Sequence, residues 1–153
     1  MSETTILQKG DVLQKEALSA SATTIYPGDL LEIDSAGAVK EHATAGGNAR
    51  PVLVAIENGL QGDEVSEVYT AESLVQYIAP KSGDEVLLRL ATSQTIAIGD
   101  RLESASAGLV QKHTPDGDSS QYVGSGYTDP VVAIAMEAVT TTTAIDYIWA
   151  MIA

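Results

Sequence analysis

An internal repeat constrains the fold of this chain more than any other feature of its sequence. Residues 24–42 are TIYPGDLLEIDSAGAVKEH and residues 95–113 are TIAIGDRLESASAGLVQKH, so 11 of 19 positions are identical at an offset of 71. After a change of offset by seven residues, the Val-Ala-Ile segment at 54–56 matches the one at 132–134. A solenoid needs about three or more repeats to cover its core. The two copies therefore predict a pseudo-twofold arrangement within one barrel or sandwich.

The apolar segments of the chain are short, rich in β-branched residues and bounded by turn-forming residues, which is typical of strands. They cover residues 51–56, 72–79, 84–91, 129–136 and 144–152. Gly-Asp pairs recur six times, and five of the six are followed within two residues by Val or Leu. Because glycine accepts positive φ and Asp can bond its own nearby backbone, each pair predicts a tight turn that leads into a strand. We therefore predict an all-β (mainly β) fold, a compact β-barrel or sandwich with little helix.

The start of the chain lacks this regular succession of turns and strands. Residues 1–23 are rich in Ser, Thr, Ala, Lys and Gln with single apolar residues interspersed, and they predict an extended N-terminal arm packed only in part on the body. The β domain is then expected to span residues 24–153, with the internal repeat at 24–60 and 95–139. The Gly/Ser-rich segment 114–129 is expected to be a loop that is mobile or shaped by a partner.

The charge of the chain argues against nucleic acid as a partner. With 21 acidic and 8 basic residues, the formal net charge is -13 and the pI about 4.2, whereas phosphate binding needs clustered Lys and Arg. The absence of cysteine excludes disulfides, thiolate metal sites and cysteine nucleophiles. No apolar run approaches the ~20 residues that span a bilayer, and no secretory signal is recognisable. We expect a soluble acidic protein, with no membrane partner, that is synthesised in a reducing cytoplasm.

Candidate metal ligands are few in this sequence. His42 and His113 occupy equivalent positions of the repeat, and they either meet near a twofold axis or mark a repeated surface position at a strand end. Asp116, Asp118 and Ser120 resemble the start of a calcium loop, but the sixth and twelfth positions lack the glycine and the glutamate that such a loop needs. We therefore predict no metal site.

No motif for catalysis stands out either. The Gly-Ser-Gly cluster at 124–126 lacks the spacing of a nucleophile elbow, in which one residue separates the serine from each glycine. Paired carboxylates could hydrolyse glycosides, but with 21 acidic residues a nearby pair is expected by chance. We predict that the chain is not an enzyme and has no catalytic residues and no cofactor.

Binding through shape is the class of function that remains. Tyr147 and Trp149 are the largest apolar side chains in the last predicted strand, and both residue types are enriched at the centres of interfaces. The alternative is that they fill the core of a chain that contains no Phe. We predict an interface that includes these two residues and four apolar residues of the arm, namely Ile6, Leu7, Val12 and Leu13.

The order of these elements resembles that of the small acidic capsid decoration proteins (cement or head-stabilising proteins) of tailed bacteriophages. The resemblance is carried by YPGDLLEIDSAGAVKE, PVLVAIENGLQGDEV and VQYIAPKSGDEVLLRL within residues 24–91, and the second copy of the repeat extends it to about residue 139. It rests on turns and strands and on no catalytic motif. It implies a non-enzymatic protein on the outer surface of the head that binds the major capsid protein and stabilises contacts between its subunits.

The resemblance further implies a homo-oligomer, with a trimer favoured. Two other classes of function stay open. One is another virion structural or carbohydrate-binding β module, such as a head fibre base or a tail component, which glycan binding would favour. The other is a hydrolase with an unrecognised carboxylate or serine site, which a concave pocket of convergent acids with perturbed pKa values would favour.

Overall fold

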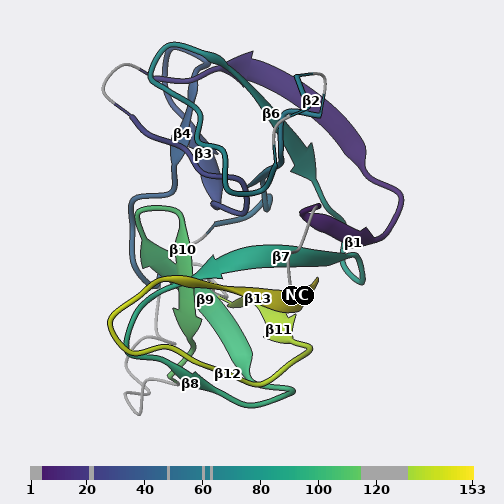
Figure 1. Ribbon diagram of the computed structural model, residues 1–153, viewed down its shortest axis with the longest axis vertical. Coiled ribbons are helices and arrows are strands. Elements are labelled where there is room, and N and C mark those ends of the chain that lie inside the picture. Colours follow the sequence, from purple (N-terminus) through teal and green to yellow (C-terminus); the bar gives the residue numbers. More distant parts are fainter. Residues whose placement is uncertain (1–4, 21–22, 48, 60, 63, 115–130) are drawn as a thin grey trace, which may run out of the picture.

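The protein consists of two small β-barrels stacked along its long axis, as the computed structural model in Figure 1 shows. The structure describes residues 5–20, 23–47, 49–59, 61–62, 64–114 and 131–153. Within these ranges the chain forms thirteen strands and no helix, which confirms the predicted all-β class and the presence of a barrel. Because the described residues contain no helix, none of them forms a long apolar helix that could cross a membrane.

The first barrel occupies the upper half of Figure 1. Its strands are β2 (Leu13–Leu18), β3 (Leu31–Ile33), β4 (Val39–Glu41), β5 (Val54–Ala55) and β6 (Leu74–Ala79). Antiparallel pairing gives a sheet in the order β2-β6-β5 and a separate β3-β4 hairpin. Two isolated bridges join the hairpin to the sheet, one antiparallel between Leu30 and Val54 and one parallel between Ser19 and Val39. These bridges close the first barrel.

The second barrel is built from β7 (Glu85–Leu90), β9 (Arg101–Ser106), β10 (Leu109–Lys112), β11 (Val131–Ala135) and β13 (Asp146–Ile152). The sheet runs β7-β10-β9-β11-β13, and pairing of β7 with β13 closes it. Strand β1 (Leu7–Lys9) pairs with the start of β7 in the same sheet, and β8 (Thr95–Ile96) pairs with β12 (Val139–Thr140). In Figure 1, β7 and β1 lie in the middle of the molecule, and β8 and β12 lie at the lower end.

Each copy of the repeat builds its own barrel, which decides between the two arrangements that the sequence left open, one barrel made from both copies or two abutting lobes. The hairpins of the two copies have the same register, since Glu32 faces Lys40 in β3-β4 and Glu103 faces Gln111 in β9-β10. The equivalence also extends to elements with no recognisable sequence identity. The parallel bridge from Ser19 to β4 recurs as the parallel pairing of Leu90 with β10, again at an offset of 71.

This wider equivalence includes residues that were predicted to form an extended arm. Residues 13–18 form β2, which is the counterpart of β7, and residues 7–9 form β1. The pairing of β2 with β6 corresponds to the pairing of β7 with β13, because Leu18 faces Leu74 in the first barrel and Arg89 faces Tyr147 in the second. Residues 7–18 therefore contribute strands to the sheets of both barrels.

One predicted match within the repeat is wrong by two residues. The backbone N–H of Gly28 donates to the carbonyl of Ala55 (2.8 Å), and the backbone N–H of Gly99 donates to the carbonyl of Ala135 (2.8 Å). Ala55 therefore corresponds to Ala135 and not to Ala133. A shift of two residues keeps every side chain on the same face of a strand, so the Val-Ala-Ile pattern alone cannot reveal it.

Two clusters of aliphatic side chains fill the molecule in the absence of Phe. The smaller cluster lies inside the first barrel and includes Ile25, Leu31 and Val39. The larger cluster fills the second barrel and also takes in outward-facing residues of the first, namely Leu30, Val54 and Ile78. The two barrels therefore share a continuous apolar contact, in which Leu30, Val54 and Ile78 of the first barrel pack with the core of the second, and we call this contact the joint.

Candidate functional site

The Gly-Asp pairs form the predicted turns, and one of these turns builds the joint. The carboxylates of Asp29, Asp84 and Asp100 each accept a hydrogen bond of 2.8 Å from the backbone N–H three residues earlier. The preceding glycines have φ of 92°, 95° and 88°, which is the left-handed region that glycine tolerates. These contacts confirm the turn interpretation for the three pairs.

The turn at residues 26–29 inserts against β7 and β13 of the second barrel. The backbone N–H of Arg89 donates to the carbonyl of Gly28 (3.1 Å), and the Arg89 guanidinium donates to Asp29 (2.8 Å). The same guanidinium lies 4.0 Å from the centre of the Tyr26 ring. The Tyr147 hydroxyl lies 3.1 Å from the carbonyl of Pro27. The turn is thus held by a backbone bond, an ion pair and a cation–π contact.

The electrostatics of this turn differ sharply between the two copies of the repeat. Asp29 is fully buried, and burial raises its pKa to about 6 even though Arg89 acts in the opposite direction. Asp100, its counterpart, is partly exposed, and its pKa is lowered by the backbone hydrogen bond from Ala97 and by Lys112. The same Gly-Asp pair therefore carries a carboxylate that burial destabilises in the joint and one that hydrogen bonds stabilise in the second barrel.

The repeated histidines take different partners. In the joint, His42 Nδ1 lies 2.8 Å from Ser104 Oγ, and both side chains are buried. His113 Nδ1 lies 2.6 Å from Glu103 Oε2. Among the described residues no group of three His, Asp or Glu side chains converges as metal ligands would. The calcium-like residues Asp116, Asp118 and Ser120 and the Gly-Ser-Gly cluster at 124–126 lie outside the described residues.

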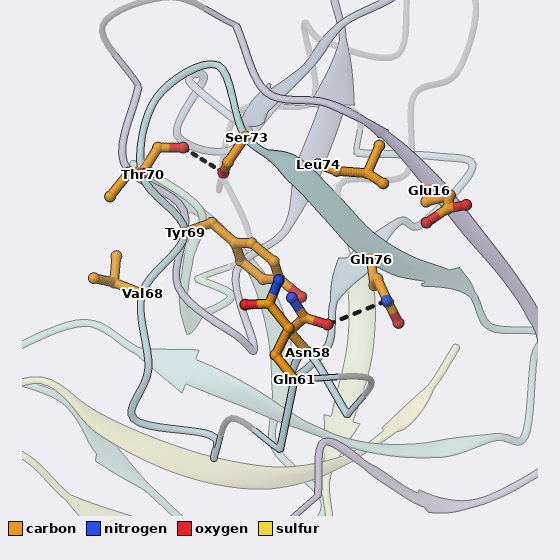
Figure 2. Close-up of a pocket in the computed structure, with 9 residues that line it drawn as sticks. All are labelled: Glu16, Asn58, Gln61, Val68, Tyr69, Thr70, Ser73, Leu74 and Gln76. Carbon is orange, nitrogen blue, oxygen red and sulfur yellow. Dashed lines mark hydrogen bonds between the residues drawn. The ribbon is translucent and has the colours of Figure 1, made fainter.

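A pocket opens on the outer face of the first barrel, between β6 and the preceding loop (Figure 2). Its volume is about 270 Å³. Three amide and three hydroxyl side chains line it, and the Gln76 amide donates to Asn58 (3.2 Å) inside it. Its lining residues are Glu16, Asn58, Gln61, Val68, Tyr69, Thr70, Ser73, Leu74 and Gln76. Glu16 is the one charged residue among these nine, and the other polar groups are neutral.

An exposed apolar patch adjoins this pocket. Leu18 on β2 faces Leu74 on β6, and they are 59% and 50% exposed. Ile33, at the end of β3, is exposed as well. Single exposed apolar residues are ordinary, but paired leucines on neighbouring strands beside a pocket are typical of contact surfaces. The signal was present in the sequence as Leu18 and Leu74, but their pairing depends on the register of β2.

The residues predicted to form an interface lie in different environments. Ile6 is fully buried, and Leu7 and Val12 pack against the larger core cluster. Leu13 is 62% exposed at the start of β2. These four residues therefore do not form one continuous exposed patch.

The two aromatic residues of the predicted interface both contact neighbouring elements. Tyr147 packs in the joint, and burial raises the pKa of its hydroxyl. Trp149 is partly buried, its indole N–H donates to Glu85 (2.9 Å), and Lys9 Nζ lies 5.3 Å from its ring centre. Tyr147 thus serves an interface between barrels, which the sequence could not distinguish from an interface between chains.

Comparisons with known proteins identify a similar fold but no family. No model of a protein family matches the sequence, and no curated protein sequence matches it. The fold is similar to that in the crystal structure of the head fiber gp8.5 N base in bacteriophage phi29, with a TM-score of 0.52 and 11% sequence identity. The match covers 92% of this chain and 95% of that chain. The likeness therefore extends over the arrangement of both barrels.

Proposed function

We propose that this protein is a non-enzymatic structural component of a bacteriophage head, which binds the outer surface of the assembled capsid and stabilises contacts between major capsid protein subunits. One observation carries the proposal: the fold likeness to a phage head fibre base spans nearly the whole of both chains. The order of turns and strands in the sequence supports the same class of protein.

The physical basis of such a role is linkage between binding and assembly. A protein that binds only the assembled lattice stabilises that lattice by its free energy of binding. An oligomer that touches several subunits gains further affinity through effective concentration, even if each contact is weak. The net charge of -13 keeps many copies soluble before they bind.

Leu13 is the most exposed of the residues predicted to contact the capsid, and it gives a specific test. Deleting residues 1–20 would also remove β2 from the first barrel, so a point substitution is the cleaner perturbation. We expect Leu13→Glu to lower occupancy on particles, whereas Ile145→Glu, at another exposed apolar position, leaves it unchanged. Equal occupancy of both variants would reject Leu13 as a contact.

The function itself is tested on gradient-purified particles from the source of the chain. We expect this protein to be present at about one copy per capsid subunit, or per local threefold position if it is a trimer. Particles stripped of the protein should melt at a lower temperature, and adding the purified chain should restore the original melting temperature. Particles that lack the chain, or that melt identically without it, would refute the proposal.

A head fibre base, a tail component or a carbohydrate-binding module is the alternative. The similar solved structure is itself a head fibre base, and the pocket with amide and hydroxyl groups suits a neutral polar ligand such as a sugar. A few copies per particle together with binding on a glycan array would favour this alternative. A copy number that matches the capsid lattice, with no glycan binding, would favour the capsid-stabilising role.

A further inference from the structure

The joint between the barrels is formed by two surfaces of different character. The turn surface of the first barrel is the turn at residues 26–29 with the neighbouring apolar residue Leu30. The groove surface of the second barrel is formed by Leu87, Arg89 and Tyr147 on β7 and β13. The fit is close, since a Cβ atom on Gly28 would lie 2.9 Å from the Tyr147 ring and 3.2 Å from Arg89 Cγ.

The second barrel has its own turn surface, which hydrogen-bonds to β11 of the same barrel but to no described residue of the first barrel. Its turn at residues 97–100 is the repeat counterpart of the turn at 26–29. Ile98 stands where Pro27 stands in the joint, and at 71% exposure it is the most exposed large apolar side chain among the described residues. A Cβ atom on Gly99 would meet no atom within 4 Å, in contrast to Gly28. An apolar turn tip is therefore presented to solvent.

The first barrel likewise has its own groove surface, which nothing in the described chain covers. By the register of β2 and β6, Glu16, Leu18 and Leu74 are the counterparts of Leu87, Arg89 and Tyr147. Leu18 and Leu74 form the exposed patch described above, and Glu16 and Leu74 also line the pocket in Figure 2. Strand β2 pairs with β6 along one edge, and its other edge is joined to β4 only beyond its end, at the Ser19–Val39 bridge, so the edge of β2 itself is open to a further segment.

The two free surfaces cannot meet within one chain. In Figure 1, β2 lies at the upper end of the molecule and β8, which leads into the free turn, lies at the lower end. Their charges are complementary. In the joint, Leu30 and Leu87 belong to one buried cluster, and their free counterparts are Arg101 and Glu16, which carry opposite charges. Such a pair favours contact between the free surfaces in one orientation.

We propose that the free turn surface of one copy docks on the free groove surface of a second copy, so that the backbone and apolar contacts of the joint are repeated between chains, with Leu18 in place of Arg89 and therefore without the ion pair. Ile98 then packs beside Leu74 and Leu18, and Arg101 lies near Glu16. The contact is heterologous, because each copy uses a different surface, and it produces a closed ring or an open filament according to the rotation between copies. This inference rests on the repeat and the joint and does not depend on a role in a phage head.

The heterologous contact can be tested by measuring self-association with sedimentation velocity and light scattering. Wild-type protein should self-associate as its concentration rises. Ile98→Glu, which damages the turn surface, and Leu74→Glu, which damages the groove surface, should each weaken association by at least about tenfold. Because each variant keeps the surface that the other has lost, an equimolar mixture should form a dimer with one copy of each and nothing larger.

Two controls keep the outcome interpretable. Ile145→Glu changes an exposed apolar side chain outside both surfaces and should associate as the wild type does. Circular dichroism and melting curves verify that each variant is folded, and Leu18→Glu replaces Leu74→Glu if the latter is not. The proposal is overturned if the wild type stays monomeric up to about 1 mM, if either damaged variant associates like the wild type, or if the mixture gives no dimer.

Discussion

Asp29 gives the sharpest prediction for stability, because a buried carboxylate at the joint makes folding depend on pH. Its folded-state pKa is about 6, against an ordinary value of 3.8. The folded protein therefore holds the Asp29 proton more tightly than the unfolded chain does. The favourable contribution of the protonated group is complete below pH 3.8 and is lost as the pH rises through 6.

The size of the effect follows from this difference in pKa. One pKa unit corresponds to about 1.4 kcal/mol, so ionising Asp29 costs the folded state about 3 kcal/mol in total. About half of that cost falls between pH 5 and pH 7.5, because much of the titration of the unfolded chain precedes pH 5. Substituting Asp29→Asn removes the titrating group. The stability of the variant relative to the wild type should therefore improve by about 1 kcal/mol between pH 5 and pH 7.5.

The measurement compares urea unfolding of both proteins at several pH values, followed by the fluorescence of the single Trp and by circular dichroism. The difference curve plots the unfolding free energy of the variant minus that of the wild type against pH. Any constant change in hydrogen bonding to Tyr26 or Arg89 shifts this whole curve but does not change its slope. Asp100→Asn is the matched control, since Asp100 occupies the same turn in the second barrel. Its pKa is lowered, so its contribution is lost only in acid, and its difference curve should be flat above pH 5.

A difference curve for Asp29→Asn that is flat between pH 5 and pH 7.5 would show that burial does not raise this pKa. A curve that is flat above pH 5 but falls as the pH rises below 5 would show that Arg89 outweighs burial and lowers this pKa. Either result would refute the description of the joint as a place where desolvation exceeds the attraction of the ion pair, which is the general expectation for a fully buried charge.

Two further predictions concern the joint. Gly108→Ala should lower the melting temperature more than Gly37→Ala. Both glycines have positive φ, but a Cβ on Gly108 would lie 2.8 Å from Asp29, whereas a Cβ on Gly37 would meet no atom within 4 Å. Equal decreases in melting temperature would contradict this prediction. Ser104→Ala should cost about 1–3 kcal/mol in urea unfolding, because it leaves the buried Nδ1 of His42 without its 2.8 Å partner, and a neutral result would contradict that role.

Much of the local structure could be predicted because it depends on neighbouring residues. Four of the five predicted segments contain strands of five to seven residues, β6, β7, β11 and β13. The fifth, residues 51–56, contains only the two-residue β5. The segment of 1–23 that forms β2 escaped prediction because five of its six residues are exposed, on both faces of the strand, so it shows no apolar alternation.

The candidate surfaces could be predicted only in part. Leu13, Tyr147 and Trp149 were identified as apolar residues suited to contact, but the sequence does not show which of them faces the other barrel. The pairing of Leu18 with Leu74 and the exposure of Ile98 depend on register and on the packing of the barrels. Sequence spacing carries no information on either.

The sequence by itself determined the duplication, the β class and the Gly-Asp turns, because each follows from local backbone preferences and from identity between two segments. Only the tertiary structure decided that each copy closes its own barrel, and that the turn at residues 26–29 is buried between the barrels whereas the turn at 97–100 is exposed. The physical reason is that burial depends on which surfaces meet. Asp29 and Asp100 have the same local turn, yet burial raises the pKa of Asp29 whereas hydrogen bonding lowers that of Asp100.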